Sequence, residues 1–403
     1  MISWQSARSI VIERVARIAR SPESERVPRR ESLMRVLAQE ICADRDYPPF
    51  DRSVRDGYAL RAADTGPGKR LRCIAEIKAG DTPKVSVAPG TCVQIMTGAA
   101  LPQDADAVLM IEYTSREGDS VTLQRGVKPG QHLVRRGSEI AGGRTIVGPG
   151  RRIGFDIIAA AAQVGLADLL VFRKPRIAIL STGDEIVSAD SAPGQYQMRN
   201  SNAEAIAAQV GYLNATPVVL PVAQDSRDSL RACIAAGLRE DALVLSGGVS
   251  AGKYDLVEPV LKELGAEIIF DAVAIRPGKP TVFALCDRRP VFGLPGNPVS
   301  TMVTFDLFAR PALDLLSGQS QPRPPLLLEA VLQESLSAQP GLAHFLPGVS
   351  EYGESPRACP LHWQGSGDVA AMSRANCLLL VPPERETIEA GERIQIMPRG
   401  AWF

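Results

Sequence analysis

An alternation of strand-like and helix-like segments between residues 176 and 316 constrains the fold of this chain more than any other feature. Four short apolar runs within it suit strands that are buried on both faces of a sheet. Segments with apolar residues at helical spacing follow the strand-like runs. The four runs are 177–180, 217–221, 242–245 and 291–294. This order predicts a doubly wound α/β domain with a parallel sheet, whose ligand binds beyond the carboxyl ends of the strands.

The run 242–245 leads into a loop of serine and glycine that we interpret as half of a polar ligand site. Gly247 and Gly248 let the backbone approach a ligand closely. Ser246 and Ser250 add hydroxyl groups, and successive backbone N–H groups in such a loop suit phosphate or another oxyanion.

The same loop nearly matches the P-loop of nucleotide-binding proteins. Gly247, Gly252 and Lys253 have the P-loop spacing, but Tyr254 stands where a Ser or Thr hydroxyl must bind Mg²⁺. A bulky phenol cannot replace that hydroxyl, so the match disfavours a general nucleotide phosphotransferase.

Three carboxylates follow the predicted strands and are expected at one edge of the sheet: Glu185, Asp225 and Asp255. Without a cation they would repel one another, so Mg²⁺, which prefers oxygen ligands and bridges carboxylates to phosphates, explains all three. As an alternative, any single one could be a helix N-cap. Arg276 and Lys279 lie on a Pro/Gly-rich frame, 276–280, and predict a ligand with several negative charges.

Charge and cysteine usage exclude several classes of protein. The 403 residues carry 45 basic and 45 acidic side chains, so bulk attraction to nucleic acid or an anionic membrane is not expected. The seven cysteines include no CxxC pair, which is typical of a reducing cytosol and not of a zinc site. Charged residues interrupt the N-terminal segment, so we expect a cytoplasmic protein without membrane contact.

The length and the changing residue pattern predict several domains. Helical spacing indicates two helices before residue 46 and another at 155–164, whereas short apolar runs indicate β-structure at 47–139 and after 320. The expected fold is multidomain α/β plus β, with a C-terminal β-barrel-like domain. The expected divisions are 1–46 with 140–170 (helical), 47–139 (small β-domain), 171–320 (α/β) and 321–403 (C-terminal β-domain).

Several motifs occur in a fixed order along the chain. They are PPFDRSVRDGYA at 48–59, TGAALP at 97–102, LSTGDEIV at 180–187, LSGGVSAGKYD at 245–255, RPGKP at 276–280, GLPGNPVS at 293–300 and GSGDVAAMSRANC at 365–377. With these motifs, the sequence closely resembles the molybdopterin molybdenumtransferases, the MoeA family, over essentially its whole length. A homologous domain also occurs in gephyrin.

The resemblance implies an elongated homodimer of four-domain subunits whose α/β domain binds molybdopterin. It implies that the β-domain of the other subunit completes the cleft. The implied reaction inserts molybdate into adenylylated molybdopterin with release of AMP, and a transient contact with the molybdopterin adenylyltransferase is a further expectation.

By matching motif positions, the resemblance also implies site residues. The catalytic ones would be Asp56, Thr97, Glu185, Asp225 and Asp255, the last three with Mg²⁺. The substrate-binding ones would be Gly247, Gly248 and Ser250 for the pterin phosphate, Arg276, Lys279 and Ser300 for molybdate or the dithiolene-side anions, and Asn297 and Glu139.

Several positions depart from the family pattern, three of them at or near the predicted substrate site. Glu139 stands where Asp is usual, Arg276 where Lys is common and Pro347 where Arg is frequent, and Arg and Lys differ in hydrogen-bond geometry. These departures leave open a paralogue that uses tungstate, or a scaffold or carrier that binds molybdopterin without turnover. The adenylyltransferase of the same pathway is disfavoured, because its activity needs only a domain like 171–320.

Overall fold

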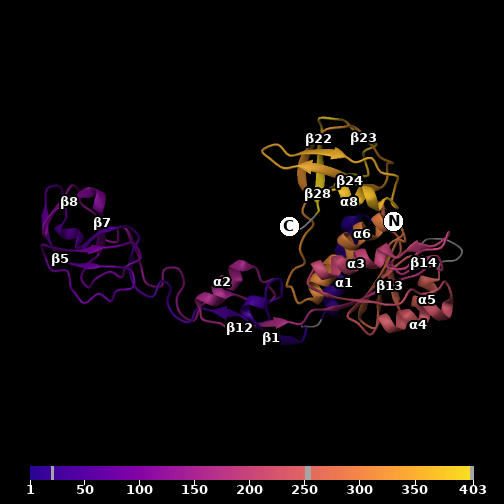
Figure 1. Cartoon of the computed structure of the whole chain (residues 1–403), viewed down its shortest axis with the longest axis horizontal. Helices are drawn as coiled ribbons and strands as arrows, with labels where there is room; N and C mark the ends of the chain where they lie inside the picture. Colours follow the sequence, from indigo (N-terminus) through magenta and orange to yellow (C-terminus); the bar gives the residue numbers. More distant parts are fainter. Residues whose placement is uncertain (20–21, 250–255, 400–403) are drawn as a thin grey trace.

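The computed structural model describes residues 1–19, 22–249 and 256–399. The chain is elongated, with the small β-domain at one end and the α/β domain with the C-terminal β-domain at the other (Figure 1). Two antiparallel pairs lie between the ends: β3 (Arg52–Ser53) with β10 (Leu133–Val134), and β2 (Ile41–Cys42) with β11 (Thr145–Val147). The divisions predicted at residues 46, 139, 170 and 320 stay predictions.

The α/β domain is built on a 6-stranded sheet. Its parallel strands are, in spatial order, β16 (Thr216–Val219), β13 (Arg176–Ser181), β17 (Ala242–Ser246) and β21 (Arg289–Leu294). These confirm the predicted strands. The sheet also has an antiparallel edge that the sequence did not predict, formed by β20 (Val282–Cys286) and β18 (Glu267–Phe270). Asp287 and Arg288, both at positive φ, form the tight turn that reverses the chain between β20 and β21.

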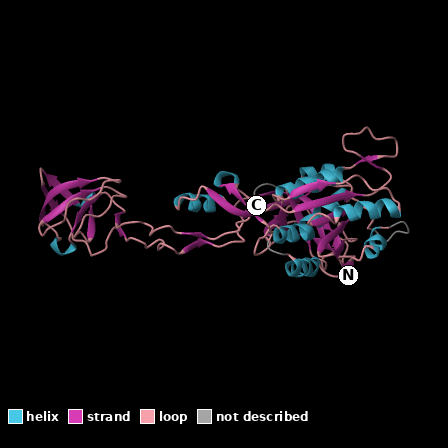
Figure 2. Cartoon of the chain, turned by 90° about the horizontal axis from the view of Figure 1, so that it is seen from below, coloured by secondary structure: helices cyan, strands magenta, loops and turns pink. Residues whose placement is uncertain are grey.

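Helices cover both faces of this sheet (Figure 2). They are α3 (Ser201–Tyr212), α4 (Arg227–Gly237), α5 (Val257–Glu263), α6 (Pro298–Thr304) and α7 (Arg310–Leu316), with a π-helical turn, Phe305–Ala309, between the last two. One face packs with α3, α6 and α7, and the other with α4 and α5. The predicted helix at the N-terminus, α1 (Trp4–Ile18), is confirmed and buries Trp4 and Val11 in the first of these cores.

The second helix predicted before residue 46 is wrong. Strand β1 (Ser24–Pro28) pairs antiparallel with β12 (Asp168–Phe172), and a short 3₁₀ turn, Arg29–Glu31, follows. Beyond it the backbone bonds to other segments, since the Leu37 N–H donates to the Arg151 carbonyl oxygen at 2.9 Å. Of the apolar residues that suggested a helix, Leu37 and Ile41 are buried in one core with helix α2 (Phe155–Gln163), whereas Leu33 is exposed. Helix α2 itself is confirmed.

The small β-domain has a 6-stranded sheet in the order β7-β4-β6-β5-β9-β8. The strands are β4 (Gly57–Leu60), β5 (Arg70–Ile77), β6 (Thr91–Ile95), β7 (Ala107–Met110), β8 (Thr114–Glu117) and β9 (Ser120–Leu123). Their apolar side chains form two cores, one on each face. The strand-like pattern of 47–139 therefore predicted real strands.

The C-terminal domain is a closed barrel, as the residue pattern predicted. Its strands are β24 (Ala343–Glu351), β25 (Arg357–Pro360), β22 (Leu328–Leu332), β28 (Arg393–Pro398) and β26 (Cys377–Val381), and β26 pairs back onto β24. Strand β19 (Ile275–Arg276) of the preceding domain extends this sheet, β23 (Leu336–Ser337) pairs with β27 (Thr387–Ile388), and α8 is Val369–Arg374. No helix in the described part of the chain is long and apolar enough to cross a membrane.

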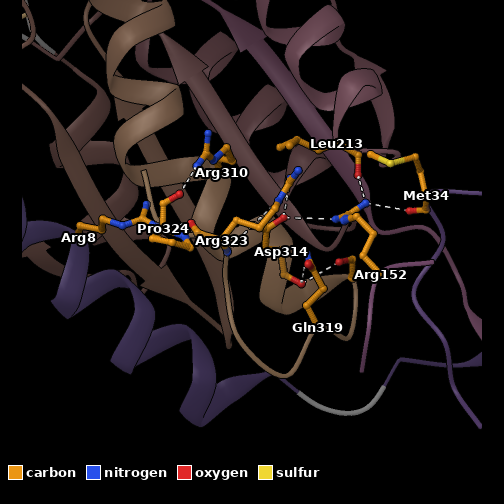
Figure 3. Close-up of polar contacts among 10 residues, drawn as sticks. Arg8, Met34, Arg152, Leu213, Arg310, Asp314, Gln319, Arg323 and Pro324 are labelled. Atoms are coloured by element: carbon orange, nitrogen blue, oxygen red, sulfur yellow. Dashed lines mark hydrogen bonds and ion pairs between the residues drawn. The ribbon is translucent and has the colours of Figure 1, made fainter. Parts of the chain in front are cut away.

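A buried carboxylate joins three parts of the chain (Figure 3). Asp314 of α7 is fully buried and lies between Arg323, at 3.0 Å, and Arg152, at 3.3 Å. Arg152 precedes α2, and Arg323 lies in the segment that leads to the C-terminal barrel. Arg8 of α1 also donates to the Arg323 carbonyl oxygen, at 2.6 Å. These charge-assisted hydrogen bonds hold the N-terminal helix, the α2 region and the barrel linker against one helix.

Candidate active site

A cavity of about 850 Å³ lies beyond the carboxyl ends of β13, β17 and β21. Residues from each of these ends line it: Ser181 at the end of β13 with Thr182 after it, Ser246 at the end of β17, and Pro295 after β21. A doubly wound sheet places the ends of neighbouring parallel strands at one edge, so this is where a ligand is expected. The cavity is therefore the candidate active site.

The predicted glycine loop forms part of the cavity wall. Gly247 and Gly248 both have positive φ, 95° and 64°. A Cβ on Gly247 would lie 2.9 Å from the Thr182 carbonyl oxygen, so only glycine fits there without displacing the neighbouring strand end. The Gly247 N–H donates to the Leu294 carbonyl oxygen at 3.1 Å, whereas no described residue accepts from the Gly248 N–H, which is available to an anion. Ser250 and Lys253, also in the predicted loop, lie outside the described residues.

Two of the three predicted carboxylates, Glu185 and Asp225, line this cavity. The Thr182 hydroxyl donates to one oxygen of Asp225 at 3.1 Å, and the Asp225 backbone N–H donates to Asp184 at 3.1 Å. Glu185 has no side-chain hydrogen bond or ion pair within the described ranges. Asp255, the third, lies outside them.

A magnesium ion fits this donor set. No group of three or more histidine, cysteine or acidic residues close enough to hold a metal occurs among the described residues. Mg²⁺, however, is usually held by only one or two carboxylates, with water and substrate phosphates as its other ligands. Among the described residues, Glu185 has no side-chain partner and Asp225 accepts from only one side-chain donor. Both carboxylates can therefore bind Mg²⁺.

Three predicted site residues lie far from the cavity, on the side of the small β-domain. The Asp56 carboxylate accepts a hydrogen bond of 2.6 Å from the Thr97 backbone N–H. That bond and one from the Thr97 side chain hold the pKa of Asp56 below its ordinary value. Glu139 forms an ion pair of 3.0 Å with Arg52. Figure 1 shows this domain at the opposite end of the chain from the α/β sheet.

Of the other predicted residues, Asn297 lines the cavity and its amide donates to the Ser366 hydroxyl at 2.8 Å. Arg276 and Lys279 are exposed and do not line it, although the next residue, Pro280, does. Ser300 is buried in α6, where its carbonyl oxygen accepts from Thr304. The structure thus brings Asn297, but not the predicted cations, to the cavity wall.

The segment that enters α3 carries functional residues that the sequence motifs did not predict. Asn200 caps this helix by accepting from the Ala203 N–H at 3.0 Å, and Ser181 donates to the same oxygen at 2.9 Å. Asn202 donates to the Ser246 hydroxyl at 3.1 Å and to the Gly296 carbonyl oxygen at 2.7 Å. These side chains connect three strand ends and hold the cavity wall in place. An Asn-Ser-Asn sequence just before a helical pattern is the signal that could have found them.

Family models match most of the chain. The MoeA N-terminal region (domain I and II) matches residues 2–165, a probable molybdopterin binding domain matches 178–315, and the MoeA C-terminal region (domain IV) matches 329–398. A molybdopterin molybdenumtransferase of Bacillus subtilis (strain 168) is 32% identical over 397 residues, covering 96% of this chain and 92% of that protein. The chain belongs to the MoeA family.

Other members of the MoeA family agree with this assignment. A molybdopterin molybdenumtransferase of Staphylococcus aureus (strain MRSA252) is 30% identical over 91% of this chain and 89% of that protein. A molybdopterin biosynthesis MoeA protein from Pyrococcus horikoshii has a solved structure with a TM-score of 0.76 and 32% identity, covering 100% of both chains. A second solved MoeA structure, from Pyrococcus horikoshii OT3, has a TM-score of 0.82 at 26% identity, over 99% of this chain and 100% of that one. The fold of the chain is thus that of MoeA proteins.

Proposed function

We propose that this protein inserts molybdate into adenylylated molybdopterin with release of AMP, as a step of molybdenum cofactor biosynthesis. The observation that carries the proposal is the single cavity lined by the Gly247–Gly248 loop and by the Glu185 and Asp225 carboxylates. Such a wall offers the Gly248 N–H to a phosphate and carboxylates to a divalent cation. The name of the Bacillus subtilis relative supports the same reaction.

The chemistry requires two anions, molybdate and the phosphoanhydride of the substrate, to approach each other. Glu185 and Asp225, with Asp255, would hold Mg²⁺, which when bound supplies positive charge that offsets this repulsion and stabilises the departing AMP. The Gly247–Gly248 loop would bind the pterin phosphate through the Gly248 N–H, because the Gly247 N–H donates to the Leu294 carbonyl oxygen. Arg276, Lys279 and Ser300 would hold molybdate beside the cavity, because Pro280 and Pro298 of the same segments line it.

Asp56 and Thr97 belong to the small β-domain, which is far from the cavity of the α/β domain. Because their domain lies at the opposite end from the α/β sheet, these residues do not reach the cavity of their own chain (Figure 1). We propose a homodimer in which the small β-domain of one subunit completes the cavity of the other. A transient contact with the molybdopterin adenylyltransferase would deliver the substrate, and we place the protein in the cytoplasm.

The test is AMP release from adenylylated molybdopterin by the purified protein with Mg²⁺, with molybdate, with tungstate and without either. Molybdate-dependent release, with molybdenum retained in the pterin, is the expected result. A preference for tungstate would identify a paralogue with an altered oxyanion. Tight binding of the pterin without release under any condition would contradict the transferase and indicate a carrier or scaffold.

A further inference from the structure

One cationic side chain stands at the wall of the cavity. Among the described residues that line it, Arg199 is the only one with a positive charge. Arg199 lies on β15 (Met198–Arg199), which pairs with β14 (Ile186–Val187) directly after Glu185. Its Nε donates to the Ser191 carbonyl oxygen at 3.0 Å. Within the described ranges it forms no ion pair, so the two terminal nitrogens of the guanidinium group are available to a ligand.

The neighbours of Arg199 reinforce its charge. It immediately precedes Asn200, the N-cap of α3, and this helix has 12 residues. The first turn of a helix leaves backbone N–H groups free and carries a partial positive charge. Ser201 and Asn202, in this first turn, also line the cavity. Arginine and helix N–H groups together therefore make this wall the electropositive side of the site.

The adjoining side of the site has the opposite character. A second cavity of about 520 Å³ shares Gly183, Ile186 and Asp225 with the first. Asp184 and Asp225 line it, and none of the described residues on its wall is basic. A substrate phosphate would be repelled from this acidic compartment unless a cation were bound there, and it would be attracted to Arg199. The charge distribution thus gives the cavity a polarity that can orient an anionic ligand.

We propose that Arg199 binds a phosphate group of the substrate and, with the first turn of α3, sets which way the pterin nucleotide lies in the cavity. The planar guanidinium group with free terminal N–H groups suits a phosphate oxygen pair. This inference deepens the proposed function and rests on it for the identity of the ligand. The anion site itself does not depend on the transferase reaction.

Binding of inorganic pyrophosphate, measured by titration calorimetry at low ionic strength, tests the site directly. Three variants are compared with the wild type: Arg199→Gln, Arg199→Lys and Arg231→Gln. Arg231 is an exposed arginine of α4 that lines neither cavity, so it controls for the loss of one positive charge from the same domain. Arg199→Gln should bind pyrophosphate about tenfold more weakly or worse, as expected for one charge-assisted hydrogen bond. Arg199→Lys should fall between, and Arg231→Gln should match the wild type.

Turnover of adenylylated molybdopterin gives a second, separate readout. Arg199→Gln should raise KM by about the same factor by which it weakens pyrophosphate binding, and it should lower kcat much less. The reason is that the lost contact binds the substrate equally in the ground state and in the transition state. Equal pyrophosphate affinity in the wild type and Arg199→Gln, or none in the wild type, would overturn the anion site whatever the transferase assay gives. If Arg199→Gln loses pyrophosphate binding and the wild type is inactive as a transferase, the anion site is supported and the proposed reaction is wrong.

Discussion

At the scale of single residues, Asp225 is the side chain on which the proposed chemistry most depends. It lines both cavities, and the Thr182 hydroxyl orients it at 3.1 Å. Asp225→Asn keeps the shape of the side chain but removes its charge. Loss of a residue that only supports a metal ligand costs up to about 100-fold, so loss of Asp225, a proposed ligand, should lower kcat by at least about 100-fold. Asp228→Asn, on an exposed residue of α4, is the control and should leave turnover unchanged. Near-normal kcat in Asp225→Asn, measured as AMP release, would remove Asp225 from the metal site.

Asp314 shows how a single buried charge can join several parts of a chain. Burial raises its pKa, but the hydrogen bonds and charge of Arg323, together with the charge of Arg152, outweigh burial and hold the pKa below its ordinary value. Asp314→Ala leaves two partly buried guanidinium groups without their carboxylate, so the free energy of unfolding should fall by about 3 to 5 kcal/mol. Urea unfolding, followed by tryptophan fluorescence, measures this; Trp4 is buried in the core that α7 shares.

The pH dependence of that loss follows from the direction of the shift. A lowered pKa in the folded state means that the stabilisation by Asp314 is complete above its ordinary pKa of about 3.9 and disappears as the pH falls through the folded value. The difference between the wild type and Asp314→Ala should therefore shrink below about pH 4. Glu329→Ala, which removes an exposed ion pair with Arg393, is the control and should cost less than about 1 kcal/mol. Equal losses in the two variants would argue against a structural role for Asp314.

At the scale of elements, the close approach of β4 and β7 depends on Gly57. A Cβ at this position would lie 2.0 Å from the Leu109 carbonyl oxygen, a distance that no relaxation of a side chain can relieve. Gly57→Ala should therefore separate these strands and disturb Asp56, the preceding residue, while the α/β domain stays folded.

Hydrogen exchange followed by mass spectrometry separates the two domains in this experiment. In Gly57→Ala, amide protection should fall in peptides from the small β-domain and stay at the wild-type level in β13 and β17. Gly66→Ala is the matched control, because its Cβ would only reach a Lys69 side-chain carbon at 3.7 Å. Unchanged protection of β4 and β7 in Gly57→Ala would contradict the steric argument.

At the scale of the whole molecule, the elongated chain places Asp56 and the cavity at opposite ends (Figure 1). If two subunits share each site, Asp56→Asn and Asp225→Asn should each be inactive, yet a mixture of the two should regain activity. In a randomly mixed population half of the dimers are heterodimers, and one of the two sites in each is intact, so about a quarter of the wild-type activity is expected. Co-expression with two affinity tags and an AMP-release assay measure it. No recovery in isolated heterodimers would mean that the sites are not shared.

Part of the site was predictable because strand ends obey a topological rule. The carboxyl ends of neighbouring parallel strands share one edge, so Gly247, Glu185, Asp225 and Asn297 were expected together, and all four line one cavity. Asn202 and Arg199 were not anticipated, because their place depends on how the segment before α3 folds across the strand ends. The ion pair between Arg152 and Asp314, 162 residues apart, has no local signal at all.

The sequence by itself determined those strands and helices in which apolar residues recur at the regular spacing of the element. Strands β13 and β17 are buried on both faces and read as apolar runs, and α4 has one apolar stripe. Only the tertiary structure decided the path of residues 24–46, the antiparallel edge at β18 and β20, and the separation of Asp56 from the cavity. Long-range backbone pairing and buried charges settle these features, and such contacts leave no periodic trace in the chain.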